Sequence, residues 1–258
     1  MEEFANTLDV VRFESTNGLW NELMLNDPWS VGYVSTLIET QEFQNKEDWE
    51  NYYYQSGEER NVKISALPID VQSKLNDEQL VRTDRIAINS MSWDYKNLNN
   101  NQGRTREQIA NKGRILYQEA QKRGIDITEE ECIEAVRFRT ICQTWNGIII
   151  RERRAIDMLQ NKFPDITFQK TDGDFDYEYA VDYQLFKDKK LICGIQIKPN
   201  SYNHSRAPYV LNAKAANQRK NANYSTEFCV PVYNVFFEKG AILNQDVFTC
   251  IQAQLEKQ

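Results

Sequence analysis

The side chains best suited to chemistry lie in one stretch, residues 182–199. Asp182 supplies a carboxylate, Gln196 an amide and Lys198 an ammonium, and the backbone carbonyl of Ile197 lies between the last two. Carboxylate, amide and carbonyl oxygens are the hard donors that Mg²⁺ accepts, with waters and substrate phosphate oxygens completing its shell. A magnesium ion there would polarise a phosphodiester and acidify a water, and the lysine would neutralise developing charge. The stretch therefore predicts metal-dependent phosphodiester hydrolysis.

Alternating hydrophobicity indicates how these groups come together. Two short arms, 181–186 and 191–198, alternate apolar and polar residues as half-buried strands do. Opposed residues of an antiparallel pair share a face, so the two apolar sets must be opposed if either is to be buried. We therefore expect Asp182 directly across from Gln196, with Lys198 two residues further along the same face. The full expected register opposes Val181 with Ile197, Tyr183 with Ile195 and Leu185 with Cys193, and leaves a three-residue turn at 188–190.

A neutral Gln196 leaves the predicted metal site one negative charge short, so another acid is needed. Glu152, in a predicted helix upstream, is the first candidate, although the run Arg151–Arg154 is also typical of an ion-paired surface. Other acids lie just before the first arm: Asp174, Asp176 and Glu178. Asp176 is also the alternative to Asp182 as the first acid. In the expected register Asp176 overshoots the partner strand, which favours Asp182.

The elements predicted around this hairpin form a mixed sheet with flanking helices, an α/β (α+β) arrangement. Two capping boxes, at Thr105–Gln108 and Thr128–Glu131, begin helices, the second kinked near Gly147 and ended by Pro164. The remaining expected elements are a strand at 166–169, a turn at 171–174, hairpin arms at 177–186 and 191–198, a helix at 213–222, a strand at 228–238 and a helix at 245–256.

The first hundred residues read as a mostly helical region for DNA recognition or dimerisation, followed by a nuclease core at 101–258. Asp27–Pro28 begins one helix, and residues 46–55 form another. In the second helix, the tyrosines 52–54 are expected to pack in a core, although base stacking is the competing interpretation. The polar segment Asn97–Arg104 is the expected boundary, as a solvated linker or as a loop that reads base edges.

The pattern Asp182…Gln196-Ile197-Lys198 resembles the PD…(D/E)xK nuclease motif, with Gln in place of the second acid and Val181 in place of the proline. Within it, GIQIKPNSY at 194–202 resembles type II restriction endonucleases of the MjaI kind. Residues 29–32, 49–52 and 103–105 fit the same family. The resemblance implies a restriction-endonuclease-like core, a helical glutamate at the metal site, and hydrolysis that leaves 5′-phosphate and 3′-hydroxyl ends.

Composition narrows the remaining possibilities. The net charge is −7 and the isoelectric point is near 5.0, which argues against a protein that coats nucleic acid non-specifically but allows a locally basic cleft. The single His204 excludes a His-cluster zinc site, and no glycine-rich phosphate loop is present. Five scattered cysteines are typical of free thiols in a reducing compartment. With neither a membrane-spanning run nor a signal-peptide pattern, we expect a cytoplasmic protein without membrane association.

We therefore predict a Mg²⁺-dependent type II endonuclease that cuts double-stranded DNA as a homodimer, because cutting both strands of a palindrome calls for two-fold symmetry. One alternative is a structure-selective nuclease, of the junction-resolvase or repair type, on the same core. The other is a non-catalytic interaction module with a purely structural hairpin. The candidate DNA contacts are Arg104, Asn200, Tyr202, Lys214, Arg219 and Lys220, the last three competing with a solvated basic face.

Overall fold

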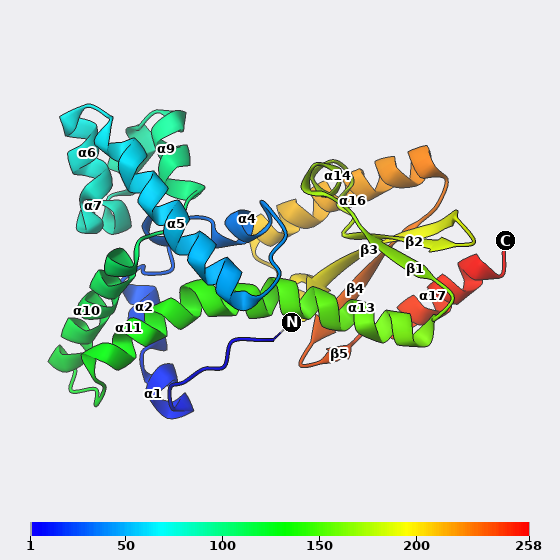
Figure 1. Cartoon of the computed structure of the whole chain (residues 1–258), viewed down its shortest axis with the longest axis horizontal. Helices are drawn as coiled ribbons and strands as arrows, with labels where there is room; N and C mark the ends of the chain where they lie inside the picture. The colour runs from blue at the N-terminus through cyan, green and yellow to red at the C-terminus, as the bar shows by residue number, and fades with distance from the viewer. Residues whose placement is uncertain (1, 258) are drawn as a thin grey trace. The chain divides into compact units, whose positions relative to one another are not determined.

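The computed structural model describes residues 2–257, except for the side chain of residue 209. The chain forms two compact units, residues 1–148 and residues 149–258 (Figure 1). The predicted division at residue 100 therefore differs from the observed one, because residues 101–148 pack within the first unit. That segment holds two long helices whose apolar faces are buried against other helices of this unit.

The described part of the first unit is helical. Its core gathers around α5, in which Trp49, Tyr53 and Tyr54 are buried. This agrees with the packing interpretation of the tyrosine run. The helices are α1 (Val10–Ser15), α2 (Asn17–Glu22), α3 (Pro28–Val31), α4 (Val34–Ile38), α5 (Lys46–Ser65), α6 (Ile69–Asn76), α7 (Glu78–Thr83), α8 (Arg85–Ser90), α9 (Trp93–Asn100), α10 (Arg106–Lys122), α11 (Glu129–Arg137) and α12 (Gln143–Trp145).

Both predicted capping boxes are present. The side chains of Thr105 and Gln108 satisfy each other's backbone N–H groups at the start of α10, and Thr128 and Glu131 do the same for α11. The predicted kink near Gly147 is a pair of π-helical turns, Phe138–Cys142 and Asn146–Ile150, on either side of α12. Such turns absorb an extra residue in a helix and are frequent near functional sites.

The segment expected to be a solvated linker, Asn97–Arg104, is instead part of the core. Arg104 is only 2% exposed, and its guanidinium donates to the backbone carbonyls of Trp29, Asn99, Gln102 and Gly103. A Cβ at Gly103 would lie 2.1 Å from the Tyr53 carbonyl oxygen, so only glycine fits this close approach. The guanidinium donors of Arg104 therefore serve the fold, which favours a structural role over the predicted DNA contact.

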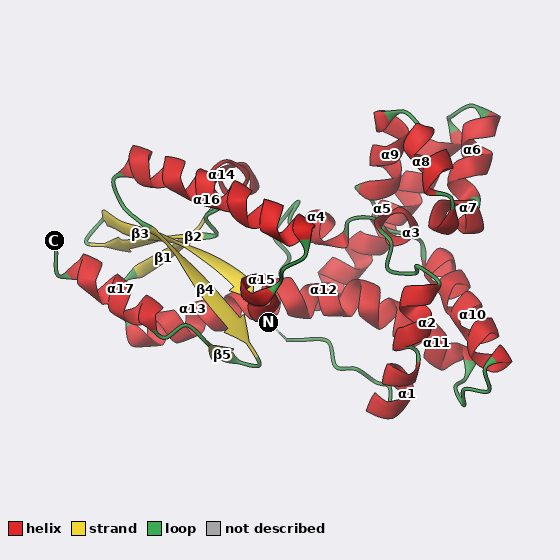
Figure 2. Cartoon of the chain, turned by 180° about the vertical axis from the view of Figure 1, so that it is seen from behind, coloured by secondary structure: helices red, strands yellow, loops and turns green. Residues whose placement is uncertain are grey.

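The second unit is a five-stranded mixed sheet with helices on both faces (Figures 1 and 2). The strands lie in chain order, β3 and β4 are parallel, and the other neighbours are antiparallel. The strands are β1 (Thr167–Lys170), β2 (Tyr183–Lys187), β3 (Lys190–Pro199), β4 (Val232–Glu238) and β5 (Ala241–Ile242). The helices are α13 (Arg151–Lys162), α14 (Gly173–Tyr179), α15 (Asn200–His204), α16 (Pro208–Phe228) and α17 (Asp246–Leu255). The predicted α+β fold class is confirmed.

Two apolar clusters cover the two faces of this sheet. The larger packs Leu185, Cys193, Ile195 and Ile197 against residues of α13 and α17. The smaller centres on Tyr179, Val181 and Tyr224, from α14, the segment before β2, and α16. The sheet is thus held rigidly between helices, which leaves the strand ends as places where polar side chains can gather.

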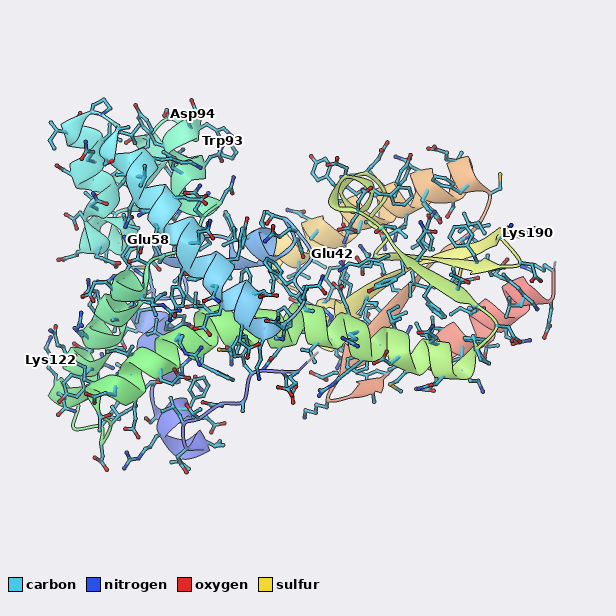
Figure 3. All side chains as sticks on the ribbon, in the orientation of Figure 1. Glu42, Glu58, Trp93, Asp94, Lys122 and Lys190 are labelled. Carbon is cyan, nitrogen blue, oxygen red and sulfur yellow. The ribbon has the colours of Figure 1, made fainter. Side chains whose placement is uncertain are left out.

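The central hairpin follows the predicted register in its middle and departs from it at both ends. Tyr183 opposes Ile195 and Leu185 opposes Cys193 as expected. A β-bulge follows, so that Phe186 pairs with Leu191 and Ile192 has no partner residue on β2. The turn is therefore the two residues Asp188 and Lys189, both left-handed (φ 49° and 67°), rather than three. Figure 3 shows the labelled Lys190 at this tip.

Pairing of β2 begins only at Tyr183, since the segment before it is helix α14 rather than strand. Asp172 caps that helix through its side chain, and Ala180 ends it in the left-handed region. The predicted turn at 171–174 and strand from 177 are wrong for this reason. Val181, expected opposite Ile197, packs against Tyr224 instead.

Candidate active site

Asp182 lies where α14 ends and β2 begins, and its backbone is fixed on both sides. Its N–H donates to the Ile195 carbonyl at 2.9 Å, and its own carbonyl accepts from the Thr171 N–H at 3.1 Å. The carboxylate Oδ2 accepts the Ile197 N–H at 2.5 Å. The Asp182 side chain thus takes the place of a strand partner at the edge of β3, which holds its carboxylate against the Gln196–Lys198 segment.

Gln196 is 2% exposed, and its side-chain Oε1 is buried without a hydrogen-bond partner among the described residues. Leaving such an acceptor unpaired costs about 1–3 kcal/mol. A buried polar atom without a partner is uncommon in native structures and asks for an explanation such as a bound ion. The amide oxygen is therefore suited to bind a cation that the polypeptide itself does not supply.

The Ile197 carbonyl faces the same side of β3 as Asp182. Peptide groups alternate in direction along a strand, and the Gly194 N–H donates to Pro231, on the β4 side. The Ile197 N–H and carbonyl consequently point the other way, toward β2, as the bond to Asp182 Oδ2 shows. Because β2 pairing does not reach this far, the carbonyl oxygen stands beside the Asp182 carboxylate.

Lys198 is half-buried and acts on Asp182 through its charge, lowering the pKa of that carboxyl group. The ammonium forms no hydrogen bond or ion pair with any residue that the structure describes. The two charges therefore act on each other without a direct ion pair.

Burial raises the pKa of Asp182 to about 7, and the nearby Glu152 and Asp176 carboxylates add to this shift. The charge of Lys198 and the hydrogen bond from the Ile197 N–H oppose it. Burial disfavours the ionised form of this carboxyl group. A divalent cation bound beside it would favour that form, because the cation supplies a compensating positive charge.

The structure places two predicted acids within electrostatic range of Asp182. Glu152, in the first turn of α13, is half-buried and lies 3.7 Å from the Lys170 ammonium. Asp176 is on α14, so it faces Asp182 from a helix rather than from an extended strand. Among the described residues, no hydrogen bond or ion pair ties the other two acids considered, Asp174 and Glu178, to the site.

These donors fit a hard divalent cation of the Mg²⁺ type. No group of three or more His, Cys, Asp or Glu side chains between residues 2 and 257 is arranged to hold a metal. A cation at this site would instead be held by mixed oxygens: the Asp182 carboxylate, the unpartnered Gln196 Oε1 and the Ile197 carbonyl. Mg²⁺ is commonly bound by one or two carboxylates, with water and substrate oxygens in the remaining positions.

Most of the predicted DNA contacts cluster on α15 and α16. Tyr202 accepts a hydrogen bond from Asn217, and the Lys214 ammonium lies 5.6 Å from the Tyr202 ring centre. Asn200 is tied to Glu238 at 3.1 Å. The other two basic residues differ: Lys220 donates to the Tyr177 carbonyl and lies over its ring, whereas Arg219 is exposed.

Sequence reasoning missed the position of Arg151. It treated this residue as one of three arginines in a basic cluster, but the structure places it within electrostatic range of both Glu152 and Asp182. In the sequence, only its position next to Glu152 links Arg151 to the site, and that position does not show which way the side chain points.

Comparison with known families identifies one family for this chain. A family model described as MjaI restriction endonuclease matches residues 16–234, which include Asp182, Gln196 and Lys198. The match places the protein among the restriction endonucleases, which are nucleases that bind and cut DNA at specific sites. The chain belongs to the MjaI restriction endonuclease family. No curated protein and no solved structure matches it significantly. Among the described residues, no helix is both long and apolar enough to cross a membrane.

Proposed function

We propose that this protein is a type II restriction endonuclease that requires Mg²⁺ and hydrolyses both strands of a specific duplex site. The observation that carries the proposal is the arrangement at the end of β3. There the Asp182 carboxylate accepts from the Ile197 N–H, beside a buried Gln196 oxygen that has no partner. A structural hairpin has no need of an unsatisfied amide next to a buried carboxylate, whereas a cation site does.

In this proposal Asp182, Gln196 and the Ile197 carbonyl hold the cation, and Glu152 supplies the negative charge that Gln196 lacks. A bound Mg²⁺ would polarise the scissile phosphate and acidify a water. Lys198 orients that water and offsets the charge that develops on the phosphate oxygens. Asp176 is the second candidate for the added negative charge, because it too acts on Asp182.

The DNA backbone is proposed to lie along α15 and α16, where Arg219 is exposed and Lys214 spends one donor on the Asn203 carbonyl and keeps two for phosphates. Asn200 and Tyr202 lie on α15. Phosphate contacts of this kind position a duplex without reading its sequence. We further propose a homodimer, since two active sites related by two-fold symmetry match a palindromic site. The expected location, the cytoplasm of the producing cell, stays a prediction.

The test is digestion of a plasmid of known sequence by the purified protein, with Mg²⁺ and with EDTA. The proposal expects discrete fragments in Mg²⁺ and none in EDTA. It also expects Asp182→Ala and Lys198→Ala to abolish cutting while remaining folded. Lys190→Ala is the matched control, because Lys190 lies on the same strand at the exposed hairpin tip (Figure 3).

The outcomes separate this proposal from its rivals. Cleavage only of branched or damaged DNA would point to a structure-selective nuclease on the same core. Full activity in both Asp182→Ala and Lys198→Ala would remove this site from catalysis. A folded protein that cuts no DNA substrate in any divalent metal would point to a non-catalytic module. Calorimetry that measures calcium binding by the wild type and by Gln196→Ala tests the cation site without relying on cleavage.

A further inference from the structure

Arg151 opens α13, directly after the π-helical turn Asn146–Ile150. Its Nε is buried without a hydrogen-bond partner, and the side chain makes no hydrogen bond or ion pair with any side chain or backbone group that the structure describes. The residue as a whole is half-buried, and its terminal nitrogens are not among the buried atoms without a partner. The Nε end of the Arg151 guanidinium is therefore buried, and its terminal N–H groups donate to no acceptor that the structure describes.

The surroundings of Arg151 tie it to the candidate active site. The carboxylates of Glu152 and Asp182 both act on its charge, whereas burial lowers its pKa. The Glu152 carboxylate lies 3.7 Å from the Lys170 ammonium. Arg151 is thus a permanent positive charge held next to two acids without a direct ion pair to either.

Arg151 is half-buried and its Nε has no acceptor, so an anion bound beside it would supply a hydrogen-bond partner that the protein does not. Glu152 and Asp182 only partly compensate, because both are committed elsewhere: Glu152 to Lys170, and Asp182 to the Ile197 N–H. The anion that a nuclease brings to this place is a phosphodiester. The planar guanidinium presents paired donors that match two phosphate oxygens, a geometry that lysine cannot reproduce.

We propose that Arg151 is a further catalytic residue, which donates hydrogen bonds to the non-bridging oxygens of the scissile phosphodiester. This inference rests on the proposed nuclease function. In the hydrolysis, a water oxygen forms the new bond to phosphorus and the bond from phosphorus to O3′ breaks. The water loses a proton and O3′ gains one. Arg151 exchanges no proton and stabilises the charge on the phosphate oxygens as the bonds change.

The test measures single-turnover cleavage and, in Ca²⁺, DNA affinity. Arg151→Ala should slow cleavage by roughly 10²-fold, the effect of removing one preorganised donor, with a much smaller change in affinity. Arg151→Lys should retain part of the rate, because the charge stays but the fork is lost. Arg153→Ala is the matched control: it is exposed on the same helix and should cut within about twofold of the wild type.

Rescue separates catalysis from structure. Millimolar guanidinium chloride, far below the molar range that unfolds proteins, should restore part of the rate of Arg151→Ala and none of the rate of Asp182→Ala. Thermal unfolding checks each variant, and Arg151→Gln replaces Arg151→Ala if the latter does not fold.

Two results would overturn the inference while leaving the nuclease proposal intact. One is wild-type cleavage by Arg151→Ala when Asp182→Ala is inactive. The other is a rate loss that follows lost affinity and is not rescued by guanidinium. A wild-type protein that cuts no DNA would instead overturn the nuclease proposal, and this inference with it.

Discussion

The carboxylate of Asp182 accepts the backbone N–H of Ile197 at 2.5 Å, although the two residues are fifteen positions apart in the chain. This bond joins the end of α14 to the end of β3, and it places a carboxylate between a buried amide and a lysine. The geometry of the site depends on it, because pairing of β2 itself stops at Tyr183.

Replacing Asp182 should separate its hydrogen-bonding role from its charge. Asp182→Asn keeps an oxygen that accepts the Ile197 N–H, so the fold should persist, while cleavage in Mg²⁺ should fall by on the order of 10³-fold. Asp182→Ala should lose activity to the same extent and also some stability, about 1 kcal/mol, with the hydrogen bond. Circular dichroism and single-turnover kinetics measure the two effects. Equal cleavage by Asp182→Asn and wild type would show that the charge is not needed.

Gln196→Met should trade activity for stability. It fills nearly the same volume and removes an acceptor that has no partner, so the metal-free protein should gain roughly 1 kcal/mol of unfolding free energy. Cleavage and calcium binding should both weaken. Urea unfolding in EDTA gives the first quantity and calorimetry the second. A loss of stability in EDTA would mean that the amide is satisfied within the protein and is not waiting for a cation.

The pH dependence of stability should carry the signature of Asp182. Its pKa is raised to about 7 in the folded protein, against about 3.9 in an unfolded chain. Between these values the folded state holds a proton that the unfolded state has lost, so stability falls as pH rises from 4 to 7. The difference in melting temperature between wild type and Asp182→Asn, measured in EDTA, should therefore grow over this range. A difference that is flat with pH contradicts the shift.

Saturating Ca²⁺ provides the control for this titration. A bound divalent cation favours the ionised carboxylate, so the pH dependence between 4 and 7 should shrink in the wild type and stay unchanged in Asp182→Asn.

Arg104 and Lys214, both predicted to contact DNA, should behave in opposite ways. Arg104→Ala removes donors from four backbone carbonyls, two of them in buried hydrogen bonds, and should cost about 2–4 kcal/mol of stability, although the Trp29 carbonyl keeps the Asn99 amide as a donor. Lys214→Ala should leave stability unchanged, weaken DNA binding at low salt and lower the salt dependence of binding. Denaturant melts and filter binding at several salt concentrations distinguish them. Weaker binding by a fully stable Arg104→Ala would reverse the assignment of Arg104 to the core.

The sequence by itself determined the centre of the hairpin. Alternating hydrophobicity opposed Tyr183 with Ile195 and Leu185 with Cys193, because burial leaves a strand only one way to face. The same alternation, with the Gln196–Lys198 spacing, predicted the candidate site, and the resemblance of residues 194–202 to the MjaI kind implied the family that the comparison shows. Both helix-capping boxes were also readable, since capping depends on residues three positions apart.

Only the tertiary structure decided which polar residues face the site and which serve the core. Arg104 and Arg151 are both arginines in polar stretches. One is held by four carbonyls within the first unit, and the other has an orphaned nitrogen near Asp182. No local pattern separates them, because the partners of Arg104 are backbone carbonyls, which every residue carries, and packing of the unit decides which of them face the guanidinium. The bulge at Ile192 and the two-residue turn were hidden for a similar reason. A β-bulge disrupts the hydrogen-bond ladder at one place only, and the packing of the whole sheet decides where it occurs.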